Sequence, residues 1–168
     1  MFYSKKLKKF KEINHIFFSN KNGFSKGIYK SLNCGQGSKD SKKNIFKNLK
    51  YVSDKMLLKK NNLILMNQTH SNKVIEVKKG VFGLKKINSD AIITKTKGLG
   101  LGVVTADCVP IIVYDAENKI IGCIHAGWKG ALSGIIKNTI FKIKQINSKN
   151  KIYAVIGPCI GKNSYEVD

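Results

Sequence analysis

Three residues that could bind a metal ion each follow a short apolar run of the chain. They are His70 after the run 63–66, Cys108 after the run 101–104 and His125 after the run 120–124. Imidazole nitrogen and thiolate sulfur are ligands of zinc and copper. Two histidines and one cysteine leave the fourth tetrahedral position of a zinc ion open, which is the arrangement of catalytic rather than structural zinc sites.

The spacing of these residues does not by itself identify a metal site. They lie far apart in the sequence and match no short zinc motif. Two histidines satisfied within the fold and one buried cysteine explain the same pattern, since a lone cysteine is more often a small buried hydrophobe. The positions at strand ends favour the metal site, because loop mouths on a rigid scaffold commonly carry functional residues.

Residues beside these candidates could support the same chemistry. Asp107 could orient an imidazole or act as a base, and it also suits a turn. The segment Gly-Trp-Lys-Gly at 127–130 precedes a predicted helix. There Gly127 permits close backbone approach, and the N–H groups of a helix start favour an anion. Lys129 would add positive charge and Trp128 could stack on a base; a tight turn with a packed tryptophan is the alternative.

Apolar periodicity predicts the elements that must position these residues. Strands are predicted near 63–66, 74–77, 91–94, 99–104, 111–114, 120–124 and 152–156. One helix is predicted from a cap at Ser38 or Asp40 to about Leu58, and a second over 132–143. Residues 1–37 are predicted to be irregular or β-rich, with glycine turns. We expect one domain, residues 1–168.

The composition limits the class of protein. The chain has 168 residues, 42% of them hydrophobic, which fits a globular domain. Its net charge of +21 comes entirely from scattered lysines, as in the usage of an AT-rich genome. Specific nucleic-acid recognition commonly uses arginine forks, so such a partner is not expected. No apolar run is long enough for a membrane span, and no secretory segment is recognisable, so we expect a cytoplasmic protein.

Five ordered motifs and an N-terminal segment together resemble one protein family. The motifs are Gln68-Thr69-His70, Asp90 to Thr94, Thr105 to Pro110, His125 to Gly130, and Gly157 to Gly161 with Tyr165-Glu166-Val167; the N-terminal segment comprises residues 18–25 and 31–33. They resemble the multicopper polyphenol oxidase (laccase) domain family. That family is also described as purine nucleoside phosphorylase, and its members include a peptidoglycan-editing factor. The resemblance covers nearly the whole chain.

This resemblance implies an α+β fold with layered mixed β-sheets flanked by helices, related to predicted cysteine hydrolases. It implies zinc, with copper as an alternative, bound at the positions of His70, Cys108 and His125. The implied substrates are a purine nucleoside (adenosine, inosine, guanosine or methylthioadenosine) and phosphate, with adenosine deamination as a further activity. A metal suits deamination because it lowers the pKa of bound water towards about 7.

The chain departs from the family pattern at three places. Lys21 and Lys129 stand where the family usually has arginine, so positive charge persists but bidentate geometry is lost. Asn22 replaces the first glycine of the N-terminal signature. The family domain normally continues past Tyr165-Glu166-Val167, so we expect a C-terminally truncated domain. Lys21, Gly127, Trp128 and Lys129 are the expected substrate-binding residues.

The leading hypothesis is a zinc-dependent purine nucleoside phosphorylase with adenosine deaminase activity. In the first alternative, Cys108 is the nucleophile of a hydrolase that edits a peptidoglycan precursor, with His125 or His70 as its base. A copper-dependent polyphenol oxidase would need several copper ions, which three ligands do not furnish. An inactive fragment and a lysine-rich nucleic-acid binder are the alternatives outside enzymes. The oligomeric state is left open.

Overall fold

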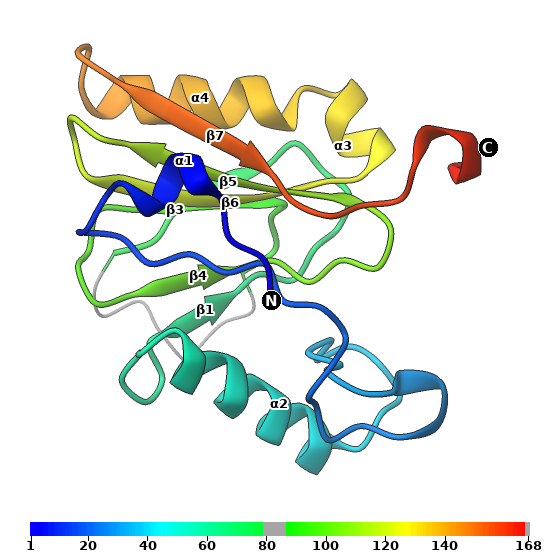
Figure 1. Cartoon of the computed structure of the whole chain (residues 1–168). Coiled ribbons are helices and arrows are strands. Elements are labelled where there is room, and N and C mark those ends of the chain that lie inside the picture. The colour runs from blue at the N-terminus through cyan, green and yellow to red at the C-terminus, as the bar shows by residue number, and fades with distance from the viewer. Residues whose placement is uncertain (79–86, 167–168) are drawn as a thin grey trace. The chain divides into compact units, whose positions relative to one another are not determined.

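The computed structural model describes residues 1–78 and 87–166 (Figure 1). Its contacts divide the chain into two compact units, Met1–Asn62 and Leu63–Asp168. Each unit has its own helices or strands. The single domain expected from the sequence stays a prediction, as does the truncation.

The first unit is mostly irregular chain beside one long helix. Its elements are α1 (Lys5–Lys8), the 3-10 helix η1 (Gly27–Tyr29) and α2 (Lys42–Lys55), together with an isolated antiparallel bridge between Phe2 and Phe17. Ser4 caps α1, because its Oγ accepts a hydrogen bond from the backbone N–H of Leu7. The helix predicted from a cap at Ser38 or Asp40 to about Leu58 is α2. The predicted cap was wrong, because the N-cap residue is Ser41, and the helix ends earlier, at Lys55.

Buried Asn48 ties α2 to the loop that carries the N-terminal signature. Its Oδ1 accepts from the backbone N–H of Phe24 at 2.8 Å. Its Nδ2 donates to Ser25 Oγ at 2.9 Å and to the carbonyl of Asn33 at 2.7 Å. Buried polar groups need such partners, so this one side chain fixes the path of residues 24–33.

The second unit contains a five-stranded sheet and a two-stranded sheet. The strands are β1 (Leu63–Leu65), β2 (Val74–Glu76), β3 (Ala91–Thr94), β4 (Gly100–Gly102), β5 (Val109–Asp115), β6 (Ile120–Ala126) and β7 (Ile152–Ile156). The larger sheet has the order β2-β3-β6-β5-β7, and β1 pairs with β4. The pairs β1–β4 and β2–β3 are parallel and the other pairs are antiparallel, so the sheets are mixed as expected.

Alternate residues of β6 face two different cores. Ile120 and Ile124 pack in one core with Ile135 and Ile143 of the long helix. Ile121 and Cys123 pack against the other core, which includes Ile64 of β1 and Leu101 of β4. Figure 1 shows the long helix α4 (Ile135–Ile146) on one side of these strands and β1 and β4 on the other. This three-layer arrangement confirms the predicted layered α+β fold and buries the central strand on both faces.

The second predicted helix is broken into two. α3 (Trp128–Leu132) and α4 (Ile135–Ile146) are separated at Gly134, whose φ of +91° lies in the left-handed region that glycine tolerates. Leu132 is 84% exposed, whereas Ile135 and Ile143 are fully buried. The prediction of one helix over 132–143 was therefore wrong at its start, since Leu132 belongs to a separate turn of helix.

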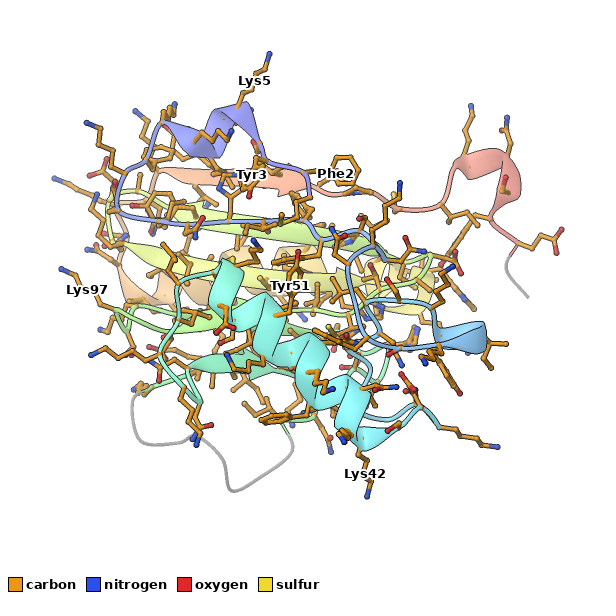
Figure 2. All side chains as sticks on the ribbon, turned by 60° about the horizontal axis from the view of Figure 1, so that its bottom comes forward. Phe2, Tyr3, Lys5, Lys42, Tyr51 and Lys97 are labelled. Atoms are coloured by element: carbon orange, nitrogen blue, oxygen red, sulfur yellow. The ribbon has the colours of Figure 1, made fainter. Side chains whose placement is uncertain are left out.

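The lysines lie mainly at the surface. Figure 2 shows the side chains of Lys5, Lys42 and Lys97 projecting away from the ribbon, and all three are exposed. In the part of the chain that the structure describes, no helix is both long and apolar enough to cross a membrane. A short 3-10 helix, η2 (Lys162–Ser164), follows β7.

Candidate metal centre

The structure brings His70, Cys108 and His125 together. One ring nitrogen of each histidine and the Sγ of Cys108 all lie within 4.8 Å of one another. The two imidazole rings meet edge to face, with centroids 4.9 Å apart and planes at 83°. His125 is buried, Cys108 is half-buried and His70 is exposed. It is the one His/Cys/Asp/Glu group of this kind within residues 1–78 and 87–166.

Three different segments supply the cluster. His70 lies in the loop after β1, and Cys108 lies directly before β5. His125 lies inside β6, paired with Pro110, because this strand continues to Ala126 beyond its predicted end. The rigid sheet therefore holds His125, while two loops deliver the other two side chains.

A fourth residue, Asp90, connects the two histidines. Its Oδ1 lies 2.8 Å from His125 Nδ1 and also accepts from the backbone N–H of His70 at 3.0 Å. Its Oδ2 accepts from both the backbone N–H and the Oγ of Ser71, each at 2.7 Å. Burial acts to raise the pKa of Asp90, but the hydrogen bonds from His125 and Ser71 outweigh it and lower this pKa to about 2. The side chain of Asp90 is thus held as an ionised carboxylate, which accepts hydrogen bonds.

One feature of the sequence could have indicated a role for Asp90: it lies directly before the apolar run 91–94, within one of the motifs that resemble the family. Its position opposite His125 comes from the register of β3 against β6, where Ala91 pairs with Ile124. The backbone N–H of His125 accordingly donates to the carbonyl of Asp90 at 2.7 Å. Such carboxylate–imidazole pairs orient metal-binding histidines in proteins.

Gly127 lies against the cluster. A Cβ at this position would lie 2.7 Å from His70 Cδ2 and 3.2 Å from Cys108 Sγ. Its φ of −71° is available to any residue, so the lack of space, and not the backbone conformation, requires glycine here. Gly127 therefore leaves room for two of the proposed ligands, and its predicted role in substrate binding stays a prediction.

The other predicted site residues differ in their placement. Trp128 is half-buried at the start of α3, and exposed Lys129 has its Nζ 5.1 Å from the centroid of the Trp128 ring.

Asp107 is exposed, and its carbonyl accepts from the backbone N–H of Ile160 at 3.0 Å. The carboxylate bonded to His125 is Asp90, so a catalytic role of Asp107 stays a prediction. Lys21 is an exposed residue of the first unit, and its role stays a prediction as well.

Tyr165 also reaches the cluster. Burial raises the pKa of the Tyr165 hydroxyl, and its interactions with Cys108 and Asp107 act in the same direction. Within the motif Tyr165-Glu166-Val167, the structure describes the first two residues, and Val167 lies outside the described residues.

The three donors fit a zinc ion. Two donors bonded to one tetrahedral zinc lie about 3.5 Å apart. Donor atoms that all lie within 4.8 Å of one another are therefore close to the separation that one ion requires. With Nδ1 of His125 bonded to Asp90, its Nε2 is left to bind a metal.

Comparisons with known proteins point to one family. Residues 14–168 match the family described as "Multi-copper polyphenol oxidoreductase laccase". A purine nucleoside phosphorylase of Rickettsia conorii is 42% identical over 110 residues, which is 66% of this chain and 45% of the relative. The purine nucleoside phosphorylase YlmD of Bacillus subtilis is 32% identical over 169 residues, 94% of this chain and 60% of the relative. The chain thus spans about half to three fifths of the length of these relatives.

Two solved structures have folds similar to that of this chain. The hypothetical protein YfiH of Bacillus licheniformis superimposes with a TM-score of 0.84 at 30% identity, over 89% of this chain and 59% of that protein. YlmD of Geobacillus stearothermophilus gives a TM-score of 0.83 at 27% identity, over 89% of this chain and 58% of that protein. The family match over 14–168 and these two folds agree with the motifs around the cluster, and the chain therefore belongs to the multi-copper polyphenol oxidoreductase laccase family.

Proposed function

We propose that the chain is a zinc-dependent purine nucleoside phosphorylase with adenosine deaminase activity. The observation that supports this most directly is the convergence of His70, Cys108 and His125 into one cluster, in which His70 is exposed. The names of the relatives indicate an enzyme of the purine nucleoside phosphorylase kind. Since the chain spans only part of their length, the activity of the whole relative is a proposal here.

Each residue of the cluster has a distinct part in this proposal. His70, Cys108 and His125 hold the zinc ion, and Asp90 orients His125. The bound ion supplies a Lewis acid that lowers the pKa of water and stabilises negative charge. Exposed His70 borders the open side, where a substrate enters, and Tyr165 borders the side of Cys108.

Phosphorolysis needs a positioned phosphate and a positioned base. In this reaction a phosphate oxygen forms a bond to C1′ of the ribose, the bond from C1′ to the purine nitrogen breaks, and the base takes up a proton. Exposed Lys129 offers positive charge to the phosphate, and the Trp128 ring offers a face to the purine. Lys21 is a second candidate for the phosphate, through the family resemblance of its segment.

The test is incubation of the zinc-loaded chain with inosine and phosphate, followed by chromatography of hypoxanthine and ribose 1-phosphate. We expect a phosphate-dependent product from the wild type and loss of at least about tenfold in rate and in metal content in His70→Ala. His15→Ala is the control for removing a histidine elsewhere. No phosphate-dependent product from a folded, zinc-loaded chain would overturn the phosphorylase proposal.

Deamination is tested separately with adenosine in the absence of phosphate. In this reaction water adds to C6 of the purine ring and ammonia leaves, so inosine and ammonia are the products. We expect both products from the zinc-loaded chain and neither from His70→Ala. Ammonia release that is independent of His70 would contradict the assignment of deamination to this cluster.

A Cys-dependent hydrolase acting on a peptidoglycan precursor is the second candidate. The observation that favours it is the series Cys108, His125 and Asp90, in which a carboxylate orients an imidazole beside a thiol, as in nucleophilic cysteine enzymes. A burst of one released group per chain, in metal-free protein, supports this candidate. Zinc inhibits the burst if Cys108 is the nucleophile, whereas zinc is required for phosphorolysis.

Two further alternatives have separate outcomes. A copper-dependent polyphenol oxidase requires oxygen uptake with a phenol in copper-loaded protein, and the described residues offer one three-ligand cluster for this. A lysine-rich nucleic-acid binder requires a salt-dependent mobility shift with bare DNA and no metal. The cytoplasmic location and the absence of a specific nucleic-acid partner stay predictions.

A further inference from the structure

We propose that Asp90 is the positioning residue for both histidines of the cluster: it fixes His125 in the Nδ1–H tautomer and anchors the loop that presents His70. This inference rests on the proposed metal role of His70, Cys108 and His125. Asp90 itself touches neither substrate nor metal in this proposal. It acts through two hydrogen-bonded segments that are far apart in the sequence.

The first line of support is the contact between Asp90 and His125. Asp90 is fully buried, and its Oδ1 lies 2.8 Å from His125 Nδ1. A carboxylate offers acceptors and no donor, so the imidazole must donate its Nδ1–H to make this bond. In a neutral imidazole the lone pair is then on Nε2, which is the atom left to bind a metal. Fixing this tautomer keeps the proton off Nε2, so that this nitrogen stays available to bind a metal.

The second line of support is the loop at 69–71. Asp90 accepts from three consecutive backbone N–H groups, those of Thr69 at 3.2 Å, His70 at 3.0 Å and Ser71 at 2.7 Å. Successive N–H groups that point at one anion form a nest, which holds the backbone in an otherwise unfavourable conformation. His70 has a φ of +57°, in the left-handed region that non-glycine residues rarely adopt. The nest around Asp90 therefore keeps His70 in the conformation that directs its ring to the cluster.

The distribution of donors predicts what an amide would do in place of the carboxylate. The Oδ2 position receives the backbone N–H and the hydroxyl of both Thr69 and Ser71. In Asp90→Asn the amide oxygen is favoured there, because that position faces two fixed backbone donors, whereas the Oδ1 position faces one, the N–H of His70. The NH2 group then faces His125 Nδ1, which becomes an acceptor only if the ring changes to the Nε2–H tautomer. That tautomer blocks the metal-binding nitrogen.

The experiment compares the wild type with Asp90→Asn by two-dimensional NMR of 15N-labelled imidazoles in metal-free protein. We expect the Nδ1–H tautomer for His125 in the wild type and the Nε2–H tautomer in the variant. His15→Gln and His70→Gln assign the signals by removing the other two histidines one at a time. Zinc affinity, measured by competition with a chromophoric chelator, is expected to fall about 10- to 100-fold in Asp90→Asn.

Asp115→Asn is the matched control. Asp115 is also fully buried, and it accepts from Asn118 Nδ2 at 2.6 Å, Asn150 Nδ2 at 2.8 Å and the backbone N–H of Lys151 at 3.0 Å. Its loss lowers stability through a comparable network that includes none of the cluster residues. We expect this control to keep the His125 tautomer and to keep zinc affinity within about threefold of the wild type.

The outcomes separate this inference from the proposed function. An unchanged tautomer with unchanged zinc affinity in folded Asp90→Asn overturns the role of Asp90. If Asp90→Asn does not fold, the wild-type spectrum decides: an Nε2–H tautomer of His125 overturns the inference, and an Nδ1–H tautomer supports it. A wild type that binds no zinc sinks the proposed metal function, while the tautomers still test the positioning by Asp90.

Discussion

The side-chain amide of Gln68 pairs with the backbone of Val104 through two hydrogen bonds. Gln68 Nε2 donates to the carbonyl of Val104 at 2.8 Å, and the backbone N–H of Val104 donates to Gln68 Oε1 at 2.9 Å. A primary amide carries the same donor and acceptor as a peptide group, so Gln68 continues the pairing of β1 with β4 beyond Leu65 and Gly102. It thereby ties the chain before His70 to the chain before Cys108.

Gln68→Ala should therefore weaken both the fold and the metal site. The change removes two hydrogen bonds at half-buried groups, which predicts a loss of about 1–3 kcal/mol in the free energy of unfolding, measured with urea. Zinc affinity should fall because two ligand-bearing loops are released from each other. Asn67→Ala is the control: it removes the exposed bond from Asn67 Nδ2 to Asn88 Oδ1 at 2.8 Å and should cost about 0.5 kcal/mol or less. Equal effects of the two changes would contradict this role of Gln68.

Gly127→Ala should reduce zinc affinity with a smaller effect on stability. The added methyl group would lie 2.7 Å from His70 Cδ2, a distance at which the ring must move, and 3.2 Å from Cys108 Sγ. The backbone at Gly127 tolerates alanine, so the displaced ligands are the main consequence. We expect a loss of at least about tenfold in zinc affinity, measured by chelator competition.

Gly161→Ala is the matched control for Gly127→Ala. No atom lies within 4 Å of a Cβ built on Gly161, and its φ of −75° suits alanine. This control should bind zinc like the wild type. Gly127→Ala with wild-type affinity would show that His70 is not a ligand in the position seen here, since the ring could then move without consequence.

Much of the second unit could be predicted from the sequence, because its buried strands are short apolar runs bounded by polar residues or glycines. The runs 63–66 and 91–94 coincide with β1 and β3, and the motif residues His70, Cys108 and His125 do come together. The pairing of Asp90 with His125 could not be predicted, since it depends on the register of β3 against β6. Register follows from packing between distant segments, which a single sequence does not specify.

The break of the second helix has a similar cause. The apolar residues Leu132, Ile135 and Ile136 continue one helical pattern, and the pattern gives no sign that the chain changes direction. Gly134 signals only weakly, because a single glycine is tolerated within helices at a cost of about 1 kcal/mol. Its left-handed conformation accompanies the packing of Ile135 and Ile143 in the core with the sheet, which depends on segments distant in the sequence.

The four cysteines should differ sharply in their reactivity with iodoacetamide at pH 7.5. Burial raises the pKa of Cys34 to about 11 and that of Cys123 to about 12, so fewer than about one in a thousand of these thiols is ionised. Cys159 is exposed and Cys108 is half-buried, and these two should be modified in folded, metal-free protein. Peptide mass spectrometry measures each site separately.

Zinc should protect Cys108 and leave Cys159 reactive. A thiolate bonded to a metal is a poor nucleophile towards an alkylating reagent, so the rate at Cys108 should fall at least about tenfold when zinc is added. Cys159 serves as the internal control, because it is no member of the cluster. Equal rates at Cys108 with and without zinc would remove it from the ligand set.

Stability of the first unit should decrease as the pH falls below about 6.5, because of His15. This side chain is 5% exposed, and its Nε2 accepts from the backbone N–H of Ser4 at 2.9 Å. Burial lowers the pKa of His15, and the charge of Lys8 acts in the same direction. The unfolded chain then binds more protons than the folded one, so stability is fully present above pH 6.5 and is lost as the pH falls towards the folded pKa.

His15→Gln isolates this contribution, because the glutamine Oε1 can accept from Ser4 without titrating. Between pH 7.5 and pH 5.5 the wild type should lose up to about 1.4 kcal/mol more than the variant, which is the limit for a histidine that stays neutral in the fold. Urea unfolding at the two pH values measures the difference, and His70 and His125 contribute equally to both proteins. An identical pH dependence in both proteins would mean that His15 titrates in the fold as it does in the unfolded chain, because only a pKa that differs between the two states makes stability depend on pH.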